Sequence, residues 1–247
     1  MLVNPNTKSN FGKVFEYQKE LQNIYKDDFG QYLDYEEMMK VERIYDMVGK
    51  FLGRENKKFV FNDLNLNLKS KRCIPSIDWL KHIGVINYCY QLKNIEKPIK
   101  TNFIENSFKI YHFDTGMLIS QLDVESMNDL RINKNFNTYN GALYENAIAN
   151  SLYKQDFKLF YWKNNKGIAK VDFVVETFNN VIPIEVKANK GDSSSLNKFL
   201  SEFRNKNVAF GIKLSRNNIS FQNDIYTIPY FLAFKLKEFI KHIEKNL

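Results

Sequence analysis

Two short segments in the C-terminal half constrain this chain most, because both follow the two-residue period of a β-strand. They are residues 170–176, with the sequence KVDFVVE, and residues 181–187, with the sequence VIPIEVK. If the two strands pair through a turn at residues 177–180, the charged side chains converge on one side of a sheet. These charged side chains are Asp172, Glu185 and Lys187. The apolar side chains expected to face the core are Val171, Phe173 and Val175 in the first strand and Ile182, Ile184 and Val186 in the second.

Two carboxylates and one ammonium held side by side are the groups that a Mg²⁺-dependent phosphodiesterase needs. Carboxylates bind this hard cation, which keeps several of its waters. A lysine can orient or help to deprotonate a water molecule and can offset charge on the phosphate. The pattern therefore predicts that Asp172 and Glu185 bind Mg²⁺ or Mn²⁺ and that Lys187 assists the attacking water.

The same residues resemble the PD-(D/E)XK nuclease superfamily. Val171-Asp172 matches the first half of its motif, and Glu185-Val186-Lys187 matches the second half. The resemblance implies a restriction-endonuclease-like α/β fold, which is a mixed sheet flanked by helices. It also implies a preceding helix that often supplies a further glutamate, and Tyr144-Glu145-Asn146 fits that place.

Glu145 lies in a segment, residues 140–154, that we expect to be helical. With roughly 100° of rotation per residue, the other side chains on the helix face of Glu145 are small or apolar. Burying an unpaired carboxylate is expensive, and a metal site in which Glu145 is a third ligand accounts for its position. The alternative is that Glu145 pairs with a lysine at the rim of the core.

Glu-x-Lys alone is a weak signal in a lysine-rich chain, and a second copy occurs at Glu55-Asn56-Lys57. That copy lies in a polar connector with no alternating apolar frame and no strand carrying an aspartate before it. The copy at Glu185 lies in a strand of alternating apolar residues, follows Asp172 at the motif spacing and has Glu145 upstream. Simpler roles stay open, with Lys187 as a solvated strand end and Asp172 as a partner for Lys187 or Lys170.

Length and composition fit a globular protein in a reducing, cytoplasmic compartment. The 247 residues are enough for one large domain or two small ones, and 44% of them are hydrophobic. Cys73 and Cys89 have no disulfide-framework or zinc-site spacing, and no apolar run reaches the length of a membrane span. The formal net charge of +8 suits a polyanionic partner such as DNA.

The chain divides into four predicted parts. Residues 1–57 form a helical segment, in which Gly53 ends the second helix as a C-cap. Residues 58–121 form a winged-helix-like domain, residues 122–138 a polar connector, and residues 139–247 the nuclease-like domain.

The winged-helix prediction depends on alternating helix and strand patterns in residues 58–121. We expect a strand at 58–61, helices at 62–68 and 76–82, and strands at 85–90 and 107–113 joined by a basic wing at 93–102. The basic residues near the second helix are Lys69, Lys71, Arg72 and Lys81. Such groups contact DNA phosphates without reading sequence. The equally weighted alternative is a packing or protein-binding module with a solvated basic face.

Beyond the nuclease motif, the order of segments resembles the C-terminal portion of a prokaryotic AAA+ ATPase family. The segments are the helices, the winged helix, Phe113-Asp114-Thr115-Gly116-Met117-Leu118, Leu143-Tyr144-Glu145-Asn146 and the motif strands. Members often carry a glutamate where this chain has Lys170, which changes the charge balance of the site. The P-loop pattern G-x-x-x-x-G-K-[ST] does not occur, so we expect a piece of a longer chain, a natural fragment or a partner of a separate ATPase.

The sequence therefore predicts a Mg²⁺-dependent DNA nuclease. The alternative is a non-catalytic module that binds DNA or protein and works with a separate AAA+ ATPase. A third possibility is a regulatory domain whose output depends on such an ATPase partner.

Overall fold

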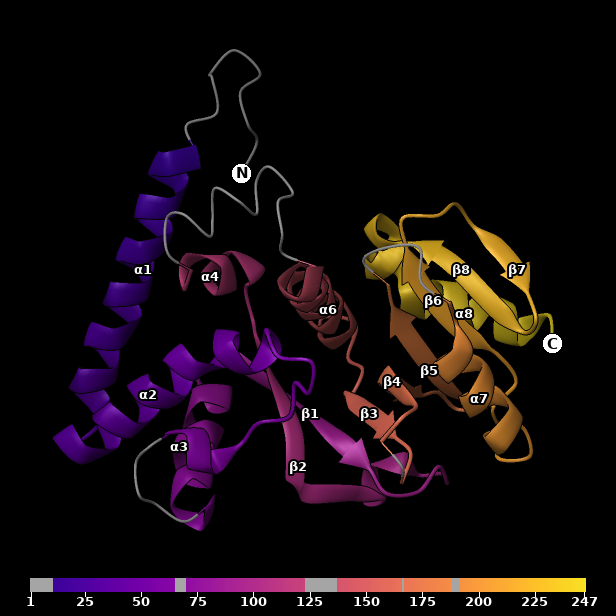
Figure 1. Ribbon diagram of the computed structural model, residues 1–247, viewed down its shortest axis with the longest axis horizontal. Coiled ribbons are helices and arrows are strands. Elements are labelled where there is room, and N and C mark those ends of the chain that lie inside the picture. Colours follow the sequence, from indigo (N-terminus) through magenta and orange to yellow (C-terminus); the bar gives the residue numbers. More distant parts are fainter. Residues whose placement is uncertain (1–10, 65–69, 123–136, 166, 188–191) are drawn as a thin grey trace.

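The computed structural model describes residues 11–64, 70–122, 137–165, 167–187 and 192–247. It is a mixed α/β structure with helices packed around one eight-stranded sheet, which confirms the predicted fold class. The N-terminal helices (indigo) lie at one end of the molecule and the last strands (yellow) at the other, with α6 between them (Figure 1). No helix in the described part of the chain is long and apolar enough to cross a membrane.

The first two helices are α1 (Phe11–Tyr32) and α2 (Tyr35–Leu52), as the helical spacing predicts. Asp34 begins α2 because its side chain accepts a hydrogen bond from Glu37 N, one of the amides left unpaired at a helix start. Gly53 caps α2 as predicted, but with φ −71°, so the left-handed conformation is not its reason. A Cβ there would come within 3.2 Å of the Tyr139 ring.

The predicted winged-helix region forms a short 3₁₀ helix, η1 (Phe61–Leu64), then α3 (Ser70–His82), β1 (Ile86–Leu92) and β2 (Phe103–His112). The expected strand at 58–61 is wrong: Phe59 makes only one backbone hydrogen bond to Phe108, and no ladder follows. The expected helix at 62–68 falls partly on residues 65–69, outside the described residues. Gly84, with φ +80°, makes the turn from α3 into β1.

The remaining elements in chain order are η2 (Ile99–Thr101), α4 (Thr115–Ser120), α6 (Asn137–Tyr153), β3 (Phe160–Lys163), β4 (Lys170–Glu176), β5 (Val181–Val186), α7 (Ser194–Phe203), β6 (Gly211–Ser215), β7 (Ser220–Gln222), β8 (Ile225–Pro229), η3 (Tyr230–Lys235) and α8 (Leu236–Lys245). The strand order is β2-β1-β3-β4-β5-β6-β8-β7. β1–β3, β5–β6 and β6–β8 are parallel pairs, and the other pairs are antiparallel.

The β1–β2 hairpin is continuous with the sheet of the C-terminal half. β1 pairs with β3 through Tyr90 opposite Phe160 and Gln91 opposite Tyr161. The sheet therefore joins the predicted winged-helix and nuclease-like regions in space. The boundary between them stays a prediction, and most of the connector, residues 123–136, lies outside the described residues.

The core has two parts, one on each face of the central strands. The larger cluster joins α2, α3, α6 and α8 to Phe173, Ile182 and Ile184. The smaller cluster places Phe199 of α7 against Trp162 and the neighbouring strand residues. Apolar burial on both faces locks β4 and β5 in place, which fixes the charged residues at the end of this strand pair.

Candidate active site

β4 and β5 form the predicted antiparallel hairpin. The backbone of Thr177 donates to Asn180 O at 2.9 Å and closes the turn, and Phe173 lies opposite Ile184. Ile182 and Ile184 belong to the larger core, as the alternation predicts. The predicted pairing of the two strands through this turn is therefore confirmed.

A β-bulge changes the start of β4. The register against β3 shifts between Phe160 and Trp162, and Val171 packs in the smaller core cluster while Phe173 and Val175 pack in the larger one. The prediction that Val171 shares a face with Phe173 and Val175 is wrong, because a bulge inserts one residue and breaks the two-residue period. Asp172 lies at this irregular position.

Asp172 meets the second motif at its backbone. Its Oδ2 accepts a hydrogen bond of 2.9 Å from Val186 N, the amide between Glu185 and Lys187. Burial and the nearby charge of Glu145 raise the pKa of Asp172 above its ordinary value, although Lys109 and Lys57 act in the opposite direction. The bulge and this hydrogen bond, more than strict alternation, bring the carboxylate to the end of β5.

Glu185 and Lys187 form an ion pair, with Nζ 2.8 Å from Oε1. The side chain of Glu185 is only 5% exposed, and its other oxygen, Oε2, is buried without a hydrogen-bond partner among the described residues. Burial raises the pKa of Glu185 despite the opposing effect of Lys187. Burial would lower the pKa of Lys187, but Glu185 and Asp172 outweigh it and raise that pKa.

Glu145 projects from α6 into a buried cluster of hydrogen-bond donors, which we call the cage of Glu145 and which consists of Lys57, Lys109 and Tyr111. Lys109 Nζ lies 2.8 Å from Oε1, Tyr111 donates to the same oxygen, and Lys57 pairs with Oε2. Burial would raise the pKa of Glu145, but Lys109 and Lys57 outweigh it and hold the pKa well below its ordinary value. The lysine pairing that the sequence left open is therefore present, with two lysines, and the metal-ligand role of Glu145 stays a prediction.

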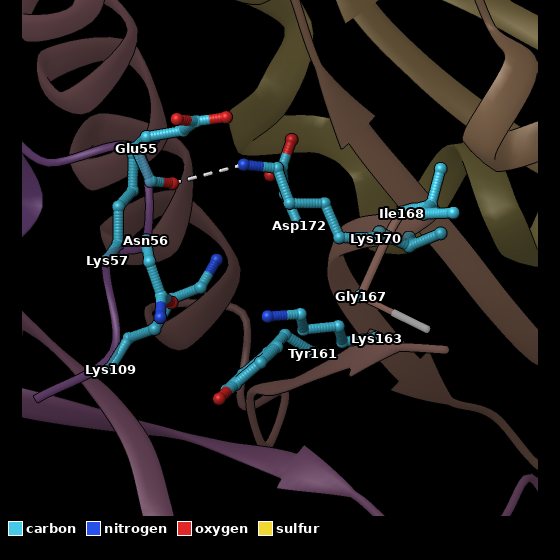
Figure 2. A pocket seen from close by; sticks show the side chains of 11 residues that line it. Glu55, Asn56, Lys57, Lys109, Tyr161, Lys163, Gly167, Ile168, Lys170 and Asp172 are labelled. Atoms are coloured by element: carbon cyan, nitrogen blue, oxygen red, sulfur yellow. Dashed lines mark hydrogen bonds between the residues drawn. The ribbon is translucent and has the colours of Figure 1, made fainter. Parts of the chain in front are cut away.

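A cavity of about 200 Å³ opens beside Asp172 (Figure 2). Four of its lining residues are lysines: Lys57, Lys109, Lys163 and Lys170. Lys170, the position where the resemblance expected a glutamate, donates across the cavity to the backbone oxygen of Glu55 at 3.2 Å. We call this cavity the lysine pocket. Glu185 and Lys187 are not among its lining residues.

Sequence reasoning missed three members of this site: Lys57, Lys109 and Tyr111. Lys57 belongs to the second Glu-x-Lys copy, which lacks a strand frame but reaches Glu145 in space. Lys109 and Tyr111 share one face of β2, and Lys109 also lies 4.9 Å from the centre of the Tyr161 ring. The available signal was Lys109 between the apolar residues Phe108 and Ile110 of a strand, since lysine is almost never fully buried without a partner.

The segments that resemble the ATPase-associated family also contact each other. Asp114 caps α4 by accepting from Gly116 N, and Asn146 donates to His112 O at 3.1 Å and to Thr115 Oγ1 at 3.0 Å. These bonds hold the middle of α6 against the end of β2 and the start of α4. They therefore position Glu145, the neighbour of Asn146, over Lys109 and Tyr111.

The donor set for a cation consists of Asp172 and Glu185. The described residues contain no cluster of three or more histidine, cysteine, aspartate or glutamate side chains arranged to hold a metal ion. Asp172 is half-buried and Glu185 is buried, and the pKa of each carboxyl is raised above its ordinary value. Oε2 of Glu185 has no hydrogen-bond partner among the described residues.

Comparison with known proteins gives two family matches. Residues 140–232 match a domain of unknown function, DUF4143, which is common in proteins associated with AAA ATPases. Residues 2–128 match a second domain of unknown function, DUF8612. No curated protein and no solved structure matches the chain. Because the second match covers more than half of its residues, the chain belongs to the DUF8612 family.

Proposed function

We propose that the protein is a metal-dependent phosphodiesterase that cleaves DNA with Mg²⁺ or Mn²⁺. The observation that carries the proposal is the buried Oε2 of Glu185, which has no hydrogen-bond partner in the described part of the chain. The next amide of the same strand, Val186 N, donates to Asp172. A buried polar atom without a partner costs free energy, and a cation between the two carboxylates would remove that cost.

The protein offers two carboxylate ligands for a divalent cation. Asp172 and Glu185 would hold it, with water filling the other positions that Mg²⁺ requires. Glu145 would support the site by its charge, because Lys57, Lys109 and Tyr111 already bind both of its oxygens. The bound ion would supply Lewis acidity toward a phosphoryl oxygen.

The protein's own groups divide the remaining work. Lys187, which forms an ion pair with Glu185, would orient a water molecule and offset charge on the phosphate. The lysine pocket offers ammonium groups to the phosphates that flank the cleaved bond. Such contacts position a nucleic acid without reading its sequence.

The test is cleavage of DNA by purified protein with Mg²⁺ or Mn²⁺, which chelation should stop. Lys187→Ala and Asp172→Asn should each reduce cutting by at least about a hundredfold, because loss of one catalytic group commonly costs orders of magnitude in rate. Lys241→Ala, an exposed lysine on α8, is the matched control and should cut like the wild type. Cutting that survives Lys187→Ala would indicate a contaminating nuclease.

A second candidate is a binding module without catalysis, which works with a separate AAA+ ATPase. The observation that favours it is the cage of Glu145, whose carboxylate is fully engaged by protein donors. The match to a domain common in ATPase-associated proteins supports the same partner class. A wild type that binds DNA but stays inert with both metals on duplex, single-stranded and branched DNA would favour this candidate.

A further inference from the structure

A stack of side chains borders the site on the side of α6 and η3. The rings of Tyr144 and Tyr230 are stacked, with centroids 4.5 Å apart and an interplanar angle of 19°. The Arg216 guanidinium lies 5.9 Å from the centre of the Tyr144 ring and donates to its hydroxyl at 3.1 Å. We call these three residues the aromatic column.

The column is connected to Glu145 through α6 and to Lys187 through a hydrogen bond. Tyr144 directly precedes Glu145 on α6, and the Tyr230 hydroxyl donates to the backbone oxygen of Lys187. Burial raises the pKa of Tyr230 to about 12, so its hydroxyl stays protonated and donates at neutral pH. The column therefore lies within a few ångströms of the backbone that carries the motif lysine.

One end of the column is open to solvent. Arg216 is exposed, and two phenylalanines that follow Tyr230 are also exposed, Phe231 at 73% and Phe234 at 62%. Both belong to η3, and residues three apart in a 3₁₀ helix lie on one side. Neither Phe231 nor Phe234 belongs to a core cluster of the described residues, and exposed apolar side chains gathered near a site indicate a binding surface.

We propose that the aromatic column, with Phe231 and Phe234, binds unpaired nucleobases by stacking, so that the site acts on nucleic acid with a single-stranded segment. This inference deepens the proposed function by naming the form of its substrate. Every base has a π face, so aromatic and guanidinium planes bind single strands with little regard to sequence. In a duplex those faces are stacked inside the helix, and only phosphates and groove edges remain to be contacted.

The test measures binding in a chelator, so that no cutting interferes. Fluorescence anisotropy compares a thymidine 20-mer, the same strand carrying abasic sites, and a duplex of equal length. Wild type should bind the thymidine strand about tenfold more tightly than the abasic strand, since each stacked base contributes substantially to affinity. A strand containing 2-aminopurine should lose fluorescence on binding, because stacking quenches this base.

Three variants separate stacking from charge. Arg216→Ala and Arg216→Lys should both remove most of the preference for bases and most of the quenching, because lysine keeps the charge but has no plane to stack. Arg204→Ala removes the same charge from the exposed end of α7, where Arg204 pairs with Asp224, and should bind like the wild type. Thermal unfolding of each variant verifies that the fold is retained.

Equal binding of the base-bearing and abasic strands by the wild type would overturn the inference, as would full rescue by Arg216→Lys. Neither result depends on catalysis. Base-dependent binding by a protein that never cuts DNA would leave the stacking inference standing and refute the proposed hydrolysis. Mg²⁺-dependent cutting without base-dependent binding would do the reverse.

Discussion

At the residue scale, the cage around Glu145 is the strongest electrostatic feature of the protein. Glu145 and Lys109 are 2% and 7% exposed, and each is buried with its opposite charge. Removing one partner of a buried pair leaves the other charge uncompensated, which costs much more than losing a surface pair. Substitutions at these residues should therefore act mainly on stability.

Lys109→Met should lower the free energy of unfolding by about 3 kcal/mol, because Glu145 would stay buried with only Lys57 and Tyr111 as partners. Lys163→Met is the matched control from the same pocket and should change the free energy of unfolding by less than about 0.5 kcal/mol. Urea denaturation monitored by circular dichroism measures both. Equal effects would contradict the prediction.

Metal binding should weaken in acid, because cation binding requires ionised carboxylates. The pKa values of Asp172 and Glu185 are raised in the folded protein, so both retain protons at pH values where exposed carboxyls have lost them. The increase in melting temperature caused by Mn²⁺ should thus be large at about pH 7.5 and should shrink toward about pH 5. Glu185→Gln should show no such increase at either pH.

The pKa of the Glu145 carboxyl is shifted in the opposite direction. Its folded-state pKa is depressed, so its contribution to stability is complete above the ordinary value of 4.5 and is lost as pH falls toward the depressed value. In the absence of metal, Glu145→Gln should flatten the acid limb of the stability curve below about pH 4.5. Chemical denaturation across pH measures this slope, and an unchanged slope would contradict the assignment.

The sequence could predict the site residues that lie in a local strand pattern, but not those that reach the site from distant segments. Asp172, Glu185 and Lys187 are marked by local strand alternation, and their segments pair as expected. Lys57 and Tyr111 reach Glu145 from positions 88 and 34 residues away, and no local period encodes those contacts. The bulge at Asp172 depends on how β3 packs against β4, which residues 170–176 alone do not specify.

At the element scale, helices and hairpins with strong local signals were predicted and the joints between them were not. α6 begins at Asn137, three residues before the expected start, and α3 begins at Ser70, six residues before the expected 76–82 helix. The parallel β1–β3 pair was missed because it joins segments about 70 residues apart, and such pairing leaves no pattern within either strand.

The basic residues of α3 give a prediction about DNA binding. Replacing Lys71, Arg72 and Lys81 with alanine should weaken binding to all DNA sequences and reduce the slope of log affinity against log salt by up to about 3. Lys241→Ala with Lys245→Ala on α8 is the control. An unchanged salt slope in the triple variant would assign α3 to protein contacts.

At the scale of the whole molecule, one sheet crosses the predicted domain boundary. The two family matches leave residues 129–139 between them, yet β1 covers the edge of β3, and the cage of Glu145 takes its donors from the N-terminal half. The halves thus share both a hydrogen-bonded sheet and a buried charge cluster. They should not be stable independently.

The intact protein should accordingly unfold in one transition, with equal calorimetric and van't Hoff enthalpies. Residues 139–247 expressed alone should unfold at a lower temperature or remain unfolded, because the edge of β3 and the carboxylate of Glu145 would lose their partners. Differential scanning calorimetry of both proteins measures this. Two transitions, the upper one matching the isolated fragment, would contradict it.

The cage of Glu145 also disfavours compact misfolded states. Its donors come from the segment after α2 and from β2, and the acceptor comes from α6, so the cluster is complete only when all three segments have docked in one register. A compact misfolded state can bury the same apolar residues almost as well, but it would trap a lone carboxylate or ammonium away from water. Burying Glu145, Lys57 and Lys109 costs free energy in the native state, but burying any of them unpaired in a misfolded state would cost more.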